Sequence, residues 1–187
     1  MFKRFTSMVG LAALCATLAG PAIAADQKLS PAQVSEKTDE QIAREVTHKI
    51  LLYSGYEIFD WVEGNVENGV VTLSGAVRLP QSQVDYTTLA SRITGVKSVR
   101  NEIRVLPLST YDDQIRRAAV LSIYRDPNFA QYVMQANPSV HILVENGRIE
   151  LKGKVATELD KRLVENRVRN SIVAFAITNN LEVEKAG

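Results

Sequence analysis

The chain has 187 residues, with 22 basic and 21 acidic side chains, a formal charge of +1 and a single cysteine. This near balance gives no support for nucleic-acid binding through bulk charge, because proteins that bind in that way carry a strong basic excess. One cysteine cannot form a disulfide within the chain.

The first 24 residues have the pattern of a secretory signal peptide. Lys3 and Arg4 precede an apolar stretch over residues 8–19, and small residues lead up to Ala24. We predict cleavage after Ala24, followed by a linker over residues 25–37. The apolar stretch is shorter than the roughly 20 residues of a membrane span, and no later stretch is longer. The expected location is the periplasm, with no transmembrane segment.

Cys15 raises the alternative of a lipid-anchored protein. Leu14 stands where a small residue normally precedes a lipidated cysteine, so we do not expect lipidation. Without Lys3 and Arg4 the exported chain would hold 20 basic and 21 acidic residues and no cysteine.

Residues 38–107 follow a helix, strand, strand, helix, strand pattern. Thr38 begins the first helix, and Gly55 is expected to end it. Strands are predicted over residues 61–67 and 70–77, because Asn68-Gly69 between them is a strong hairpin signal. A second helix from Pro80 to about Thr94 is capped by Gly95, and a last strand contains Val99, Ile103 and Val105.

Residues 110–187 repeat this pattern. Asp39, Gln41 and Ile42 recur 73 residues later, whereas Asn68-Gly69 recurs 78 residues later as Asn146-Gly147. The jump of five places an insertion after the first helix of the second copy. In that copy Val173 stands where the first has Gly95, so we expect this turn to be built differently.

The predicted fold class is α+β, with two tandem αββαβ modules. Each has a small three-stranded mixed sheet with two helices packed on one face, because a sheet of this size needs helices over one face to be stable. Gly75 and Gly153 lie inside strands on the inward face. We expect them to let a helix cross close over the sheet.

The glycines and the strand that follows them carry a family resemblance. The run from Asn68 to Gly75, the pair Gly95-Val96 and the later Asn101 resemble the motif of the BON domain, and the second copy keeps Asn146, Gly147, Gly153 and Asn179. Two such domains behind a signal peptide are similar to the dual-BON periplasmic proteins of the OsmY-like family. The resemblance implies no enzymatic activity, no cofactor, and a role in phospholipid binding, envelope integrity or chaperoning under osmotic or envelope stress.

Aromatic and sulfur-containing side chains are the first candidates for lipid contact. Phe129, Tyr132 and Met134 fall in the inserted segment of the second copy, where amphipathic rings could lie at a bilayer interface. The alternative is that Phe129 and Tyr132 close the longer loop by packing inside it.

Basic side chains of the second copy are the other candidates. Several of them converging could hold the protein on anionic phospholipid. The alternative is a solvated helix face with ion pairs between neighbouring turns. The candidates are Lys152, Lys154, Lys161, Arg162, Arg167 and Arg169.

No pattern of catalytic residues stands out. His48 and His141 have no cysteine or second histidine at ligand spacing, so we expect no metal site and two exposed or hydrogen-bonded histidines. Two functions remain: binding of anionic phospholipid at the envelope, or a periplasmic chaperone that holds protein partners in an apolar groove between the copies.

Overall fold

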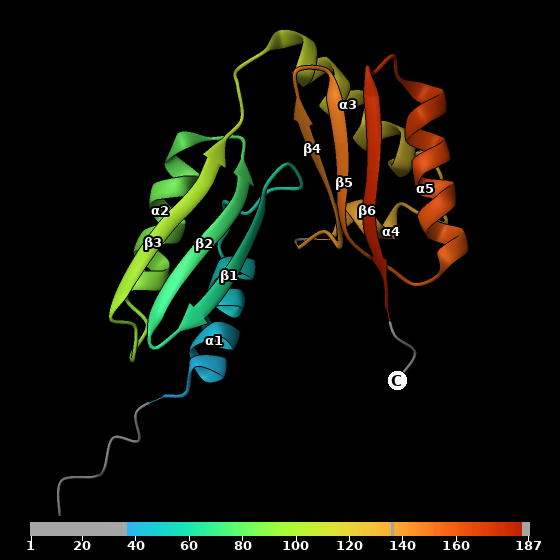
Figure 1. Ribbon diagram of the computed structural model, residues 1–187. Helices are drawn as coiled ribbons and strands as arrows, with labels where there is room; N and C mark the ends of the chain where they lie inside the picture. The colour runs from blue at the N-terminus through green and yellow to red at the C-terminus, as the bar shows by residue number, and fades with distance from the viewer. Residues whose placement is uncertain (1–36, 136, 185–187) are drawn as a thin grey trace, which may run out of the picture. The chain divides into compact units, whose positions relative to one another are not determined.

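The computed structural model of the protein describes residues 37–135 and 137–184. These residues form two consecutive modules (Figure 1). The predicted signal peptide and residues 25–36 of the predicted linker lie outside the described residues. The elements are α1 (Asp39–Leu51), β1 (Trp61–Glu67), β2 (Val70–Val77), α2 (Pro80–Ser91), β3 (Ser98–Val105), α3 (Thr110–Tyr124), α4 (Gln131–Met134), β4 (Val140–Glu145), β5 (Arg148–Val155), α5 (Glu158–Ser171) and β6 (Ala176–Val183).

Each module is a three-stranded mixed sheet with its long helices on one side (Figure 1). In the first, β2 pairs antiparallel with β1 and parallel with β3. In the second, β5 pairs in the same way with β4 and β6. The predicted fold class is therefore confirmed, and α4 lies in the predicted insertion.

The local signals of the sequence explain the start of α1 and the two hairpins. Thr38 and Gln41 form a reciprocal capping box at the first turn of α1. Asn68 and Gly69 have φ of 53° and 79°, and Asn146 and Gly147 have 51° and 72°. Two consecutive positive φ angles are what a type I′ turn requires, so both predicted hairpins are confirmed.

An aspartate in the first turn of each module's first helix holds the hairpin turn. The Asp39 carboxylate accepts hydrogen bonds from the backbone N–H groups of Asn68 and Gly69 at 2.6 and 2.8 Å. The fully buried Asp112 accepts the equivalent bonds from Asn146 and Gly147 at 2.9 and 2.7 Å. Each carboxylate therefore connects the first turn of its helix to the hairpin turn between the first two strands of its own module.

The explanation predicted for Gly75 and Gly153 is wrong. The atoms nearest to an added Cβ belong to the adjacent backbone and not to a helix, and φ is +120° at Gly75 and +111° at Gly153, inside the strands. A Cβ at Gly153 would lie 2.0 Å from the carbonyl oxygen of Ser139, and one at Gly75 would lie 2.0 Å from that of Trp61. The glycines are required by the backbone of the neighbouring strand.

Replacing Gly153 with alanine should therefore destabilise the protein by more than about 2 kcal/mol, since it adds both left-handed strain and a backbone clash. Urea unfolding measures this free energy. The neighbouring Lys154→Ala, at an exposed position of the same strand, should change it by less than about 0.5 kcal/mol. Equal effects of the two substitutions would contradict the explanation.

Helix ends differ from the sequence expectation. α1 ends at Leu51 rather than near Gly55, because Tyr53 and Tyr56 turn inward and set their rings edge-on to Tyr86, with centroids 5.5 and 6.1 Å away. α2 ends at Ser91 rather than near Thr94.

The segment before β1 and the strand β4 join the two modules. Ile58 and Phe59 pack against the core of the second module, and the backbone N–H of Ile142 donates to the carbonyl of Ile58 at 2.9 Å. On the outer faces of the sheets, Leu143 forms a small buried cluster with Ala76 and Leu106. β4 is consequently buried on both faces and shows no alternation of apolar and polar residues.

Candidate functional site

The aromatic candidates of the inserted segment are core residues. Phe129 and Tyr132 are only 4% and 7% exposed, and their rings stack with centroids 6.3 Å apart. The Tyr132 hydroxyl donates to Asp160 at 3.0 Å and accepts from the backbone N–H of Ala156 at 3.2 Å. The packing alternative is the one found, and the expectation of a ring-bearing surface loop is corrected. Met134 alone of the three is exposed.

Replacing Phe129 with alanine should cost about 3 kcal/mol of folding free energy, because it leaves a cavity in a closed core. Phe175→Ala is a matched control, since that ring is 73% exposed and loses little burial. Thermal unfolding of both variants measures the difference. Similar melting temperatures would show that the Phe129 ring is not part of the core.

Three of the six basic candidates come together. Lys152, Lys154 and Lys161 line one cavity of about 590 Å³, whose wall also includes Trp61 of β1. Arg167 and Arg169 do not join them. Arg169 pairs with Glu165 one turn away at 2.6 Å, as the ion-pair alternative expected, whereas Arg167 pairs with Asp126, 41 residues earlier in the chain, at 2.6 Å. Arg162 is exposed and is not part of this wall.

The lysines differ in how far they are neutralised. Lys152 lies 4.0 Å from Glu63, 3.7 Å from Glu150 and 5.8 Å from the centre of the Trp61 ring. Neither Lys154 nor Lys161 forms an ion pair within the described part of the chain. Lys154 is the register partner of Glu182 on β6, and both Glu182 and Glu63 line the same cavity, so its wall carries charges of both signs.

A second cavity, of about 580 Å³, adjoins the first and is more apolar. Both are lined by Trp61, Glu63, Gly153 and Lys154. The apolar part of the second wall is formed by Leu51, Tyr56, Trp61, Val62 and Pro138, with His141 beside them.

His141 is neither exposed nor fully hydrogen-bonded, which corrects the expectation for this residue. It is 2% exposed and lies against Tyr56 and Trp61, with ring centroids at 5.0 and 5.3 Å. Its Nδ1 atom has no hydrogen-bond partner among the described residues. Burial away from water lowers the pKa of His141 to about 4, so the imidazole is uncharged at neutral pH. His48, on α1, is exposed as expected.

Acidification should therefore weaken the fold through His141. Between pH 6.5 and about 4 the unfolded chain binds a proton at His141 and the folded chain does not. The free energy of unfolding therefore decreases as the pH is lowered, by about 3 kcal/mol over the whole interval. Buried Asp60 acts in the opposite direction, since desolvation raises its pKa.

The contribution of His141 is isolated by comparison with His141→Phe, which cannot titrate. Urea unfolding of both proteins at pH 7 and pH 4.5 gives the two pH dependences. The wild type should lose more stability than the variant over this interval. Parallel losses would contradict a depressed His141 pKa.

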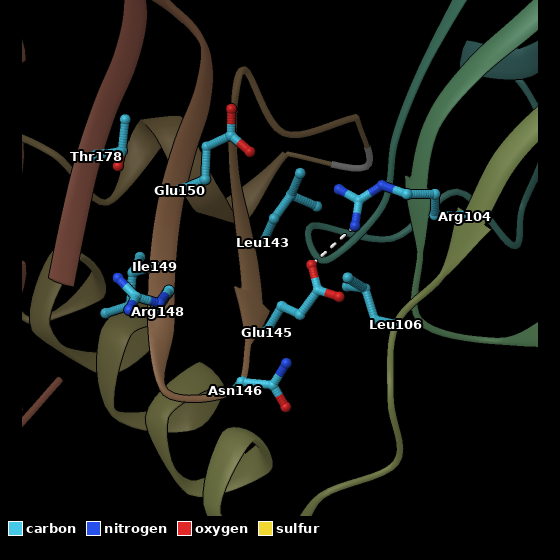
Figure 2. A pocket seen from close by; sticks show the side chains of 9 residues that line it. All are labelled: Arg104, Leu106, Leu143, Glu145, Asn146, Arg148, Ile149, Glu150 and Thr178. Atoms are coloured by element: carbon cyan, nitrogen blue, oxygen red, sulfur yellow. Dashed lines mark hydrogen bonds and ion pairs between the residues drawn. The ribbon is translucent and has the colours of Figure 1, made fainter. Parts of the chain in front are cut away.

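A third cavity, of about 480 Å³, lies beside the joined outer faces of the sheets. Leu106 and Leu143 form part of its wall, and Arg104 reaches across to Glu145 at 2.8 Å (Figure 2). Arg148 and Glu150 also line it. Opposite charges are thus present together, and this cavity offers no excess of either sign.

The sequence reasoning missed an exposed apolar surface at the hairpin end of the second module. Val173 and Phe175 are 84% and 73% exposed, in the segment between α5 and β6. Tyr111 lies beside them: its hydroxyl donates to the Val173 carbonyl at 2.8 Å, and its ring centroid is 6.1 Å from that of Phe175. We call Tyr111, Val173 and Phe175 the Phe175 edge.

The first module shows that the fold does not require these apolar side chains. Lys97 N–H donates to Gly69 at 2.8 Å, as Phe175 N–H donates to Gly147 at 2.9 Å, so Lys97 and Phe175 occupy equivalent positions. Gly95 corresponds in the same way to Val173, and the turn is built differently, as expected. α2 ends in an αR residue, whereas α5 ends in an extended one. The substitution of Gly95 by Val173 was visible in the sequence, but its exposure was not.

In residues 37–135 and 137–184, no three His, Cys, Asp or Glu side chains are grouped to hold a metal ion. No helix of that part of the chain is long and apolar enough to cross a membrane.

Two tandem αββαβ modules, each with a glycine-dependent hairpin, define a small α+β protein built from a repeated domain. The BON domain family matches residues 38–107 and 112–185, and the chain belongs to this family. BON domains are in general non-catalytic and are known to bind phospholipid membranes.

Other comparisons add little. No curated protein matches the chain. Among solved structures, it is similar to the C-terminal domain of CdsD, a structural protein of the type III secretion system of Chlamydia trachomatis, at 16% identity and a TM-score of 0.31, covering 80% of this chain and 68% of that one. A second CdsD structure matches at 15% identity and a TM-score of 0.25, covering 75% and 93%. Similarity at this level carries no argument about function.

Proposed function

We propose that the protein is a non-enzymatic, OsmY-like envelope protein of the periplasm that binds phospholipid membrane surfaces and supports envelope integrity under stress. The observation that carries this proposal is the Phe175 edge, where Val173 and Phe175 are largely exposed beside a half-exposed tyrosine. Clustered apolar side chains of this kind mark interaction surfaces rather than ordinary solvent-exposed positions.

The chemistry of the edge suits a bilayer interface. Phe175 and Val173 can bury apolar surface among the acyl chains, where full burial of such a side chain contributes roughly 1.5–3 kcal/mol. Tyr111 is amphipathic, with its hydroxyl bonded to the backbone. Arg148 is exposed and is the backbone register partner of Ala176, the residue after Phe175. One such charge near anionic lipid contributes about 1 kcal/mol.

These contributions favour reversible adsorption rather than permanent anchoring. Two apolar side chains and one cation together remain weaker than a membrane-spanning helix. The protein would then exchange between the membrane surface and the surrounding solution.

A chaperone or protein-interaction role is the second candidate. It is favoured by Leu52, which is 69% exposed directly after α1, and by Leu51, which lines the apolar cavity between the modules. In this alternative an apolar segment of another protein would bind there. Suppression of client aggregation without vesicles would support it.

Flotation with phospholipid vesicles tests the membrane proposal. Residues 25–187 should float with anionic vesicles, and added salt should weaken but not abolish the association, because the apolar contribution is insensitive to screening. The double variant Val173→Ser/Phe175→Ser should lose most of it.

Val84→Ser is the matched control, because Val84 is a 55% exposed valine of α2 in the first module. It should float like the wild type. Undiminished flotation of the double variant would remove the Phe175 edge from the proposal, and absence of flotation by the wild type would overturn membrane binding altogether.

A further inference from the structure

Each module contains one asparagine that is followed directly by glycine, and the two pairs have the same neighbour before them. A glutamate precedes the pair in both modules, at residues 67–69 and 145–147. An asparagine in this position is chemically reactive, because glycine has no side chain to hinder attack by its own backbone nitrogen on the asparagine side chain. The side chains of Asn68 and Asn146 are both exposed to water. Both are therefore candidate sites of spontaneous deamidation.

The reaction rearranges the turn and consumes only water. The glycine nitrogen loses its proton to solvent and attacks the asparagine Cγ. The new N–Cγ bond closes a succinimide ring as the Cγ–Nδ2 bond breaks, and Nδ2 takes up a proton from water and leaves as ammonia. Water then opens the ring at either of its two carbonyl groups. The product is aspartate or isoaspartate, and isoaspartate has an additional carbon in the backbone.

A carboxylate that is bonded to the glycine N–H opposes the first step. It holds the hydrogen that the nitrogen must lose, and its charge disfavours a negative charge on that nitrogen. Asp112 bonds to the Gly147 N–H at 2.7 Å and is fully buried, so water does not compete for this bond. Asp39 makes the same bond to Gly69 at 2.8 Å but is only half-buried. The protection is therefore stronger in the second module.

The side chains that cover the two glycines differ in the same direction. A Cβ at Gly147 would lie 2.7 Å from the Phe175 ring and 3.1 Å from the Tyr111 ring, so two aromatic rings cover this glycine. At Gly69 the covering side chain is that of Lys97, at 3.2 Å, and Lys97 is exposed. Aromatic rings keep water and base away from the Gly147 nitrogen more effectively than a single flexible lysine does at Gly69.

We propose that Asn68 is a deamidation site of the folded protein and that the buried carboxylate of Asp112 protects Asn146 from the same reaction. The protected asparagine adjoins the Phe175 edge, because the Phe175 N–H donates to the carbonyl of Gly147. Conversion of Asn146 would place a carboxylate beside that edge. If the edge binds membranes as proposed above, the protection keeps a negative charge away from it.

Mass spectrometry of proteolytic peptides measures the two reactions separately. Residues 25–187 are incubated at mildly alkaline pH, and the peptides that contain Asn68 and Asn146 are followed by the mass gained when an amide becomes a carboxylate. Asn68 should be converted at least about tenfold faster than Asn146, the factor expected from one charge-assisted hydrogen bond kept away from water. In urea at the same pH the two rates should be similar, because the neighbouring residues are alike. No vesicles are used, so the result is independent of membrane binding.

Substitutions assign the protection to the carboxylates. Asp112→Asn keeps an acceptor oxygen and removes the charge, and it should accelerate conversion of Asn146 several-fold without changing that of Asn68. Asp39→Asn, at a half-buried position, should accelerate conversion of Asn68 alone. Asn68→Gly suits the positive φ of this position and should abolish the modification in the first module. Circular dichroism checks that each variant is folded.

Equal conversion of the two asparagines in the folded protein would overturn the protective role of Asp112, and so would faster conversion of Asn146. An unchanged rate at Asn68 in Asp39→Asn would overturn the role given to the carboxylates in general. Retention of both amides, over a period in which the urea-unfolded chain loses both, would overturn Asn68 as a modification site.

Discussion

The bond between an aspartate and a hairpin turn organises each module. Asp112 is fully buried and accepts both backbone N–H groups of Asn146-Gly147, so the start of α3 and the turn between β4 and β5 are held as one piece. Hydrogen bonds to an ionised carboxylate are stronger than neutral ones, and they fill donors that a tight turn leaves unpaired. Gly147 in turn accepts from Phe175, which places the exposed ring at this end of the sheet.

The two modules share this scaffold and differ in what they display on it. In the first module the turn between α2 and β3, next to the hairpin, contains Gly95 and Lys97. The second has Val173 and Phe175 at the equivalent positions, and both are exposed. A fold that is stable with the first set does not need the second, so the apolar side chains are best explained by a binding partner.

Burial decides which of the predicted residues are accessible to a membrane or a ligand. Phe129 and Tyr132 looked suitable for a membrane because aromatic rings in an inserted segment are amphipathic, yet they close the core beneath α4 and β4. Lys152, Lys154 and Lys161 were separated in the sequence by up to nine positions and meet at one cavity. Arg167 and Arg169 were nearby in the sequence and are held by acidic partners instead.

The sequence by itself determined the order of strands and long helices in each module, the duplication and the two hairpins, because capping residues, Asn-Gly turns and alternating valines are local signals. It also indicated the BON domain through those same residues. It did not determine where α1 and α2 end, or that the inserted segment holds the short helix α4. It could not predict that Gly153 faces the Ser139 carbonyl, that His141 lies between Tyr56 and Trp61, or that Phe175 points outward rather than inward. Those facts depend on contacts between residues far apart in the chain, and only the tertiary structure decides which side chains such contacts bury and which they leave in water.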